Sequence, residues 1–157
     1  MTDPTENDDI VTVERFIAAP PEVIFALLVD PRQHQVIDGS GSVRDAKGEA
    51  QRLHLGSTFG MSMKIGVPYF MESTVVEFEE DRRIAWQTRG PTWLGRQVAG
   101  RIWRYELEPV DGGTKVRESW DLSEESAITK PFAKKAAAKT RTNMEKTLAR
   151  IDELVAP

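Results

Sequence analysis

QVAGRIWRYELEPVDGGTKVRESWD, residues 97–121, is the stretch that decides the fold. Its first part, residues 97–108, alternates in polarity, as a half-buried β-strand does. Residues 114–121 repeat the alternation. Between them lies Asp111-Gly112, a dipeptide that favours a tight hairpin turn. We therefore predict two antiparallel strands that are neighbours in a sheet.

The residues before this hairpin predict five more strands. They lie at residues 10–17, 42–47, 57–65, 69–78 and 83–88. After the first of them, Pro21 suits the first turn of a short helix over residues 21–29. Residues 32–38 add one or two helical turns, and Pro68 is expected to break the chain between two strands.

The residues after the hairpin predict one long helix that begins near Pro131. Apolar side chains recur there at spacings of three and four, which corresponds to about seven turns and ~36 Å. The stripe consists of Phe132, Ala136, Thr140, Met144, Leu148, Ile151 and Val155. The alanines at 136–138 make the helix slim at that point, so we expect an internal space between helix and sheet.

The order of these elements predicts the fold class. Strands that follow one another without intervening helices form an antiparallel sheet rather than βαβ units. We predict an α+β fold in which a curved antiparallel sheet of about seven strands wraps round a long C-terminal helix, with two short helices after strand 1. Residues 9–157 would form this single domain, and the acidic residues 1–8 a disordered tail.

Composition excludes several kinds of site. The 157 residues contain no cysteine, which excludes disulfides, thiolate metal ligands and a cysteine nucleophile. No apolar run approaches the ~20 residues of a membrane span, so we expect no integral membrane association and a cytoplasmic protein. The net charge is −4, but residues 130–157 hold seven basic and three acidic side chains. A basic helix face contacts nucleic acid or anionic lipid, or is simply solvated; the acidic remainder would repel phosphate, and we expect no nucleic-acid partner.

Four motifs carry a resemblance to a known family, and they occur in its order. They are APPEVIF at residues 19–25 with Asp30-Pro31, EFEEDRRIAW at 77–86, WRYELEP at 103–109, and GGTKV at 112–116. With the terminal helix, the chain resembles the START-like (SRPBCC) helix-grip superfamily, in particular its polyketide cyclase/dehydrase-like bacterial branch, over about residues 9–155. The resemblance implies the helix-grip fold. Relatives include aromatic cyclases, lipid carriers, metabolite binders and chaperone co-activators.

One segment departs from the family pattern. Many relatives carry tryptophans after the first helix, whereas residues 32–38 read RQHQVID and contain no aromatic side chain. The pocket mouth is therefore expected to be more polar than theirs. His34 and Asp38 would share a helical face there, as an acid–base pair, as half of a metal site or in a capping or surface role. One such pair is too few ligands for a metal, so we predict no metal.

Arg101 and Glu118 are the main candidates for chemistry. If Leu107 lies opposite Thr114, Arg101 and Glu118 become diagonal neighbours on the sheet face that the long helix covers. A charged pair in an apolar pocket would orient a carbonyl or carboxylate, and a buried glutamate with a raised pKa can act as acid or base. The alternative is a structural ion pair at the sheet margin. Tyr105 would add a buried hydroxyl that needs a partner.

A set of aromatic, thioether and polar side chains is predicted to line the pocket. For each member, core packing is the alternative, although methionine adapts to varied ligands and pockets are mostly apolar. The set comprises Phe59, Met61, Met63, Trp86, Trp103, Tyr105, Trp120, Phe132, Thr140, Asn143 and Met144. Trp93 and Leu94, in a loop flanked by glycines, would gate the mouth or tuck under the sheet edge.

Three functions fit these features. The first is binding of a small hydrophobic or aromatic molecule, such as a lipid or polyketide, in a cavity between sheet and helix. The second is a cyclase/dehydrase-type enzyme that moves protons with Arg101, Glu118 or Tyr105. The third is a protein-interaction module of the chaperone co-activator type, with a protein partner on the basic helix face or the Trp93 loop. No glycine-rich phosphate loop or dinucleotide fingerprint occurs, and we predict no cofactor.

Overall fold

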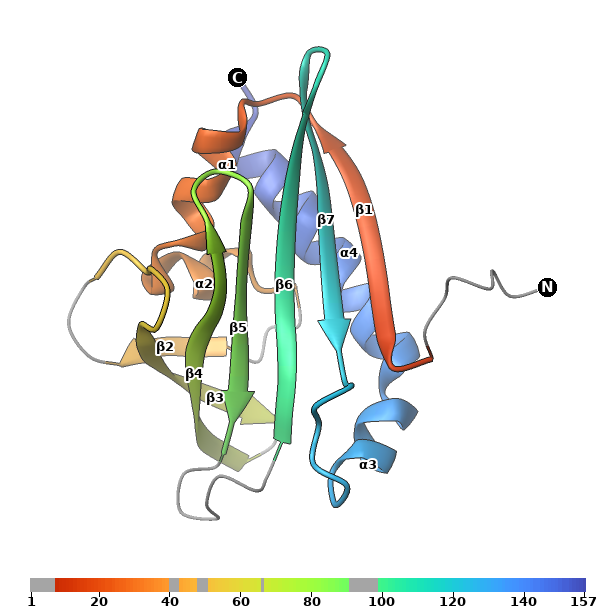
Figure 1. Cartoon of the computed structure of the whole chain (residues 1–157). Coiled ribbons are helices and arrows are strands. Elements are labelled where there is room, and N and C mark those ends of the chain that lie inside the picture. The colour runs from red at the N-terminus through yellow and green to blue at the C-terminus, as the bar shows by residue number, and fades with distance from the viewer. Residues whose placement is uncertain (1–7, 40–42, 48–50, 66, 91–98) are drawn as a thin grey trace.

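The computed structural model describes residues 8–39, 43–47, 51–65, 67–90 and 99–157. Its strands form one antiparallel sheet in the order β1-β7-β6-β5-β4-β3-β2 (Figure 1). The strands are β1 (Ile10–Ile17), β2 (Val43–Lys47), β3 (Thr58–Ile65), β4 (Val67–Glu79), β5 (Arg83–Arg89), β6 (Ala99–Val110) and β7 (Gly113–Asp121). The predicted α+β class is confirmed, and β1 and β2 are the two edges of the sheet.

Two short helices follow β1, as predicted. Helix α1 (Pro21–Leu28) has proline at its first position, and α2 (Pro31–Ile37) begins after Asp30. The Asp30 side chain accepts a 3.0 Å hydrogen bond from the backbone N–H of Arg32, which satisfies a donor that the helix leaves unpaired. Helices α1 and α2 contact each other, and both contact the C-terminal helix.

The C-terminal helix differs from the prediction, because it is divided. Helix α3 (Lys130–Lys135) ends at Ala136, whose φ of −88° and ψ of 1° interrupt the helix before α4 (Ala137–Val155). The apolar stripe holds only within α4, where Met144, Leu148 and Ile151 are fully buried. Phe132, in α3, is 72% exposed. Its predicted place in a pocket is therefore wrong.

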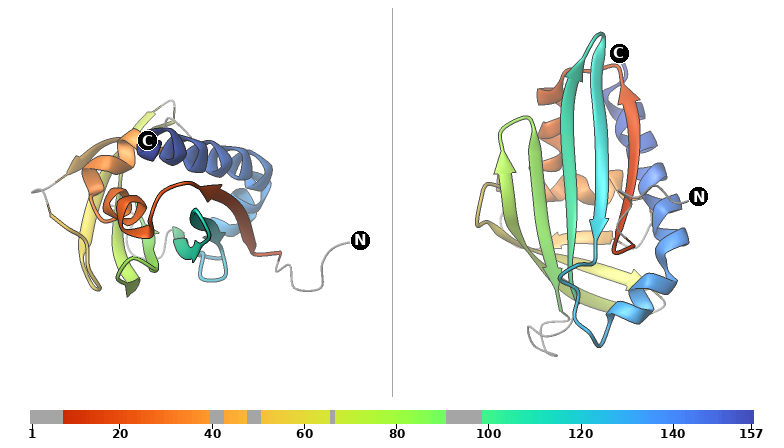
Figure 2. Two further views of the ribbon diagram at one scale, coloured as in Figure 1. Left: turned by 90° about the horizontal axis from the view of Figure 1, so that it is seen from above. Right: turned by 45° about the vertical axis from the view of Figure 1, so that its right-hand side comes forward.

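Helix α4 closes one face of the sheet. It packs mainly against β1 and also contacts β7, α1 and α2 (Figure 2, left). The core lies between α4, the two short helices and this sheet face, and it includes Phe25, Leu28 and Trp120. No helix among the described residues combines the length and the apolar character needed to cross a membrane.

Two predicted details of the strands are corrected. Pro68 does not break the chain but is the second residue of β4, opposite Lys64, close to the start of the strand where proline is tolerated. The β6–β7 hairpin closes as Val110↔Gly113 around Asp111 and Gly112, so Leu107 lies opposite Val116 rather than Thr114. Gly112 takes a φ of +82°, which glycine adopts without strain.

Candidate functional site

Glu118 is a carboxylic acid buried in the core. It lies on β7, with Tyr105 of β6 directly opposite on one side and Val13 of β1 on the other. The residue is only 2% exposed. Val116 and Trp120, two positions away on either side, are also buried and face the core with it. The strand pattern therefore places an ionisable group on the sheet face that α4 covers.

The hydrogen bonds around Glu118 are incomplete. The Tyr105 hydroxyl donates to Glu118 Oε1 at 2.9 Å. Among the described residues, Glu118 Oε2 finds no hydrogen-bond partner, and neither does the indole Nε1 of Trp120. Buried polar atoms are rarely left unpaired, since each such atom costs about 1–3 kcal/mol. Two such atoms lie on the same face of β7, so this part of the core has hydrogen-bonding groups that a further polar group could satisfy.

Burial changes the protonation of this pair. Desolvation raises the pKa of Glu118 to about 8, the hydrogen bond from Tyr105 opposes the rise, and the charge of Asp38 adds to it. The pKa of Tyr105 is raised well above its usual value by burial, by Glu118 and by Asp38. At neutral pH Glu118 is therefore mainly a neutral carboxylic acid. Its free oxygen can carry a proton, so that acid and indole both present hydrogen-bond donors.

An aromatic wall adjoins the pair. Trp86 lies between Tyr105, at 5.6 Å between ring centroids, and His34, which stacks on it at 4.7 Å. Phe59 meets both His34 and Trp86 edge-on. Three of the predicted lining residues, Phe59, Trp86 and Tyr105, are thus brought together with Glu118.

His34 lies in the interior rather than at a pocket mouth. Its ring is buried against Trp86, its Nε2 lies 2.9 Å from the carbonyl oxygen of Leu28, and burial lowers its pKa. A neutral ring whose Nε2–H donates to that carbonyl leaves Nδ1 as an acceptor. Asp38 ends α2 one helical turn later and acts on the site through its charge on Glu118 and Tyr105.

Arg101 does not pair with Glu118. Its guanidinium forms a salt bridge with Glu125, at 2.6 Å between Nη2 and Oε2, and lies 6.0 Å from the ring centre of Trp120. The shifted register moves Arg101 beyond the end of the β6–β7 ladder, where the loop after β7 supplies the buried carboxylate. The predicted Arg101–Glu118 pair is wrong. Arg101 instead ties the loop after β7 to β6, beside Trp120.

The remaining predicted residues are spread more widely. Trp103 is partly buried and packs on Trp120 at 5.9 Å between ring centroids. Met144 is buried in α4, whereas Thr140 and Asn143 are half-buried. The Met61 and Met63 side chains and the whole of Trp93 and Leu94 lie outside the described residues.

Sequence reasoning missed two contacts that fix the site. Glu125 lies in a loop without periodicity, so nothing in the sequence indicated that its side chain is buried or that Thr129 donates to it at 3.0 Å. Gly39 lies against α4, where its backbone N–H donates to the Thr147 hydroxyl at 2.9 Å. Within the described parts of the chain, no group of three or more His, Asp or Glu side chains is placed to hold a metal.

The chain is similar to several known proteins. Residues 9–156 match a family model described as polyketide cyclase / dehydrase and lipid transport. The uncharacterized protein Rv0088 of Mycobacterium tuberculosis is 32% identical over 147 residues, a match that covers 87% of this chain. The chain spans only 60% of that relative's length.

Two solved structures show the same fold at low sequence identity. Protein CV1439 from Chromobacterium violaceum superposes with a TM-score of 0.73 at 15% identity, over 96% of this chain and 99% of that one. Protein Ms6760 from Mycobacterium smegmatis gives a TM-score of 0.69 at 19% identity, over 98% and 96% of the two chains. At such identities the likeness concerns the fold alone.

Proposed function

Because the chain belongs to the polyketide cyclase / dehydrase and lipid transport family, we propose that it binds a small hydrophobic molecule against the sheet face that α4 covers. This family membership agrees with the resemblance found in the sequence motifs. The family implies a hydrophobic ligand or a cyclase-type reaction, and it does not specify the ligand.

One observation carries the proposal. Glu118 Oε2 and Trp120 Nε1 are buried on the same face of β7 and lack partners among the described residues. With the pKa of Glu118 raised to about 8, both atoms are donors at neutral pH. A carbonyl oxygen would satisfy either donor, and the aromatic side chains of Trp86 and Tyr105 suit an apolar body. The ligand is therefore an apolar or aromatic molecule with a carbonyl oxygen.

A matched pair of probes tests this ligand class. Benzophenone and diphenylmethane share two phenyl rings and differ in the carbonyl group, and quenching of tryptophan fluorescence reports the binding of either. We expect benzophenone to bind the full chain about ten-fold more tightly at neutral pH, since a buried hydrogen bond contributes about 1 kcal/mol and satisfies an unpaired donor. Equal affinities would contradict the carbonyl assignment.

Variants locate the binding. Trp120→Phe removes one donor and should reduce the preference for benzophenone, while diphenylmethane binding changes little. Glu118→Leu should reduce the preference as well. Glu14→Gln, at an exposed position of β1, is the matched control and should behave as the wild type. Native mass spectrometry of the purified chain, before and after extraction with organic solvent, would reveal a ligand that co-purifies.

A second function, catalysis of the cyclase/dehydrase type, is favoured by the protonation of Glu118. A carboxyl with a pKa of about 8 exchanges its proton near neutral pH, as general acid–base catalysis requires. Glu118 as carboxylate would remove a proton from the carbon between two carbonyls. As an acid it would return that proton to a departing hydroxyl group, which leaves as water.

The pH dependence of turnover separates an enzyme from a binder. With a poly-β-keto thioester as probe, an enzyme would show a rate that follows a group of pKa about 8 and that Glu118→Gln abolishes. A binder would protect the thioester without forming a cyclic product. Retained turnover in Glu118→Gln would exclude Glu118 as the acid–base group.

A further inference from the structure

The surface around α3 combines exposed apolar side chains with positive charge. Phe132 is 72% exposed and Ile128, in the turn before the helix, is 69% exposed. They lie four residues apart, Ile128 in the turn that the Lys130 N–H closes by donating to Ser126 O, and Phe132 in the first turn of α3, where Ala133 N–H donates to Thr129 O. Side chains with this spacing project from the same side. Exposed apolar side chains that gather in a patch mark an interaction surface.

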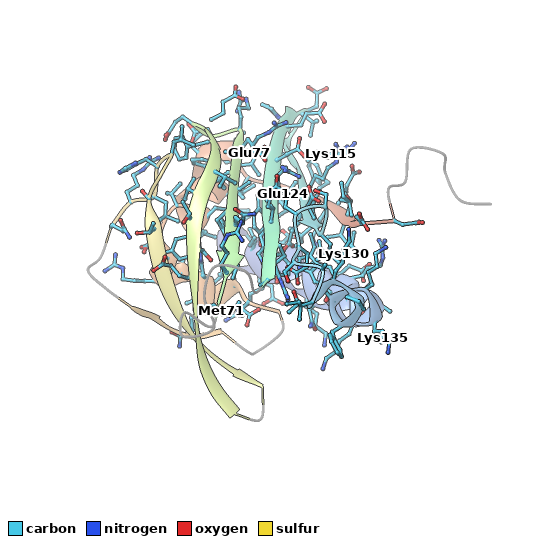
Figure 3. The ribbon with its side chains drawn as sticks, turned by 60° about the horizontal axis from the view of Figure 1, so that its bottom comes forward. Met71, Glu77, Lys115, Glu124, Lys130 and Lys135 are labelled. Atoms are coloured by element: carbon cyan, nitrogen blue, oxygen red, sulfur yellow. The ribbon has the colours of Figure 1, made fainter. Side chains whose placement is uncertain are left out.

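Exposed lysines lie close to this apolar pair in the sequence. Lys134 and Lys135 are exposed in α3, and Lys139 is exposed in the first turn of α4. Lys130 and Lys134 contact Asp9 at 2.9 and 3.0 Å, whereas Lys135 and Lys139 form no ion pair with any described residue. Figure 3, turned so that the bottom of Figure 1 comes forward, shows Lys130 and Lys135 on the α3 side of the molecule. The chain has a net charge of −4, whereas residues 130–157 hold seven basic and three acidic side chains, so positive charge is concentrated in this part of the chain.

We propose that the α3 surface, made of Ile128, Phe132, Lys134, Lys135 and Lys139, binds reversibly to an anionic lipid bilayer. Phenylalanine and isoleucine insert among the acyl chains near the headgroups, while lysines remain at the level of the lipid phosphates. Each lysine near such a surface strengthens binding about five-fold. The surface goes beyond the interior ligand site, and its test is independent of that site.

The size of the surface favours lipid over a protein partner. A stable protein interface buries ≈ 800 Å² on each side and usually has an apolar core of several residues. Here the apolar part is two side chains on a short helix, and the surrounding groups are cations on long flexible stems. A fluid anionic surface accommodates such a group without matching its shape.

Flotation of the full chain with vesicles tests the proposal. We expect binding to phosphatidylcholine vesicles that contain phosphatidylglycerol, little binding to phosphatidylcholine alone, and weaker binding as salt increases. Phe132→Ala should weaken binding about ten-fold or more, because the inserted ring is lost. The double change Lys135→Gln and Lys139→Gln should weaken it roughly twenty-five-fold.

The matched control is a change near the C-terminal end of β1, away from the α3 surface. Phe16 is 53% exposed, and the end of β1 is remote from α3 (Figure 1). Phe16→Ala should therefore bind vesicles as the wild type does. No binding to the anionic vesicles would overturn the proposal. So would binding that Phe132→Ala leaves unchanged, because lysines alone would then be acting on any polyanion.

Discussion

Tyr105 donates a 2.9 Å hydrogen bond to one carboxyl oxygen of Glu118, its direct partner across β6 and β7, and the other carboxyl oxygen has no partner among the described residues. A single donor cannot offset the loss of hydration around a carboxylate, so the acid keeps its proton to about pH 8. The pair therefore links proton uptake to folding.

The stability of the chain should fall as pH rises through the range set by Glu118. Between about 4.5, its ordinary pKa, and about 8, the folded state holds a proton that the unfolded state has released. The free energy of unfolding therefore decreases across this interval, by an amount on the order of a few kcal/mol. Urea unfolding of the wild type and of Glu118→Gln at about pH 5 and about pH 9 measures this contribution.

The variant Glu118→Gln cannot ionise and should lose this part of the pH dependence. It should be the more stable protein at the alkaline end, with the difference diminishing toward acid. Glu14→Gln is the matched control, because the pKa of Glu14 is lowered by Arg117 rather than raised. A downward slope of equal size in Glu118→Gln would assign the effect to other groups.

Tyr105→Phe should raise the pKa of Glu118 above its value of about 8. The tyrosine hydroxyl stabilises the carboxylate by donation, so its removal favours the neutral acid further. The variant should also lose about 1–3 kcal/mol of stability, since a buried acceptor loses its donor. Carboxyl ¹³C chemical shifts followed with pH measure the pKa directly, and a downward shift would contradict the assigned direction of the hydrogen bond.

Arg101→Ala should destabilise the chain by about 3 kcal/mol, because it leaves the Glu125 carboxylate buried without its cation. The Glu125 side chain is 0% exposed and Arg101 27%. The matched control is Arg52→Ala, whose partner Glu80 is 55% exposed, with an expected cost of less than about 1 kcal/mol. A double-mutant cycle with Glu125→Gln gives the coupling, and a value like that of the Arg52–Glu80 pair would show that Arg101 does not hold the loop.

Gly39→Ala should destabilise the contact between α2 and α4. A Cβ at this position would overlap the Asn143 carbonyl oxygen and lie 2.7 Å from the Lys146 Cβ. The cost is expected to be about 3 kcal/mol or more, as for overpacking against a backbone that cannot yield. Thermal unfolding measures it. Gly112→Ala is the comparison, because its Cβ would meet only the Phe16 ring at 3.9 Å and the cost is about 1–2 kcal/mol of backbone strain.

The sequence allowed the faces of the hairpin to be predicted but not the partners across it. The predicted register of Leu107 opposite Thr114 was two residues away from the observed one. A shift of two keeps every side chain on its own face, so Glu118 and Tyr105 were correctly placed together in the interior. It changes the opposite residue, however, and Glu118 pairs with Tyr105 instead of Trp103.

Other parts of the site depend on contacts that no periodicity reveals. Glu125 is buried although it lies in a loop. Its salt bridge with Arg101 depends on how that loop folds back. His34 lies on a helix that is too short for the spacing of its apolar residues to show which face is buried. The stacking of the His34 ring on Trp86 determines that it is buried. Ala136 interrupts the C-terminal helix although alanine favours helix, so local preference does not indicate this break.

The pairing of β1 with β7 determines when the domain can assemble during its synthesis. Ile10 pairs with Asp121 and Ile17 with Thr114, so β1 has no neighbouring strand in the sheet until β7 has been made. At about 5–20 residues per second, a ribosome leaves that first strand unpaired for several seconds. Helix α4, which covers β1, emerges later still. The buried face of β1 therefore stays uncovered until α4 has been made, so the packing of β1 between β7 and α4 is a late event in synthesis.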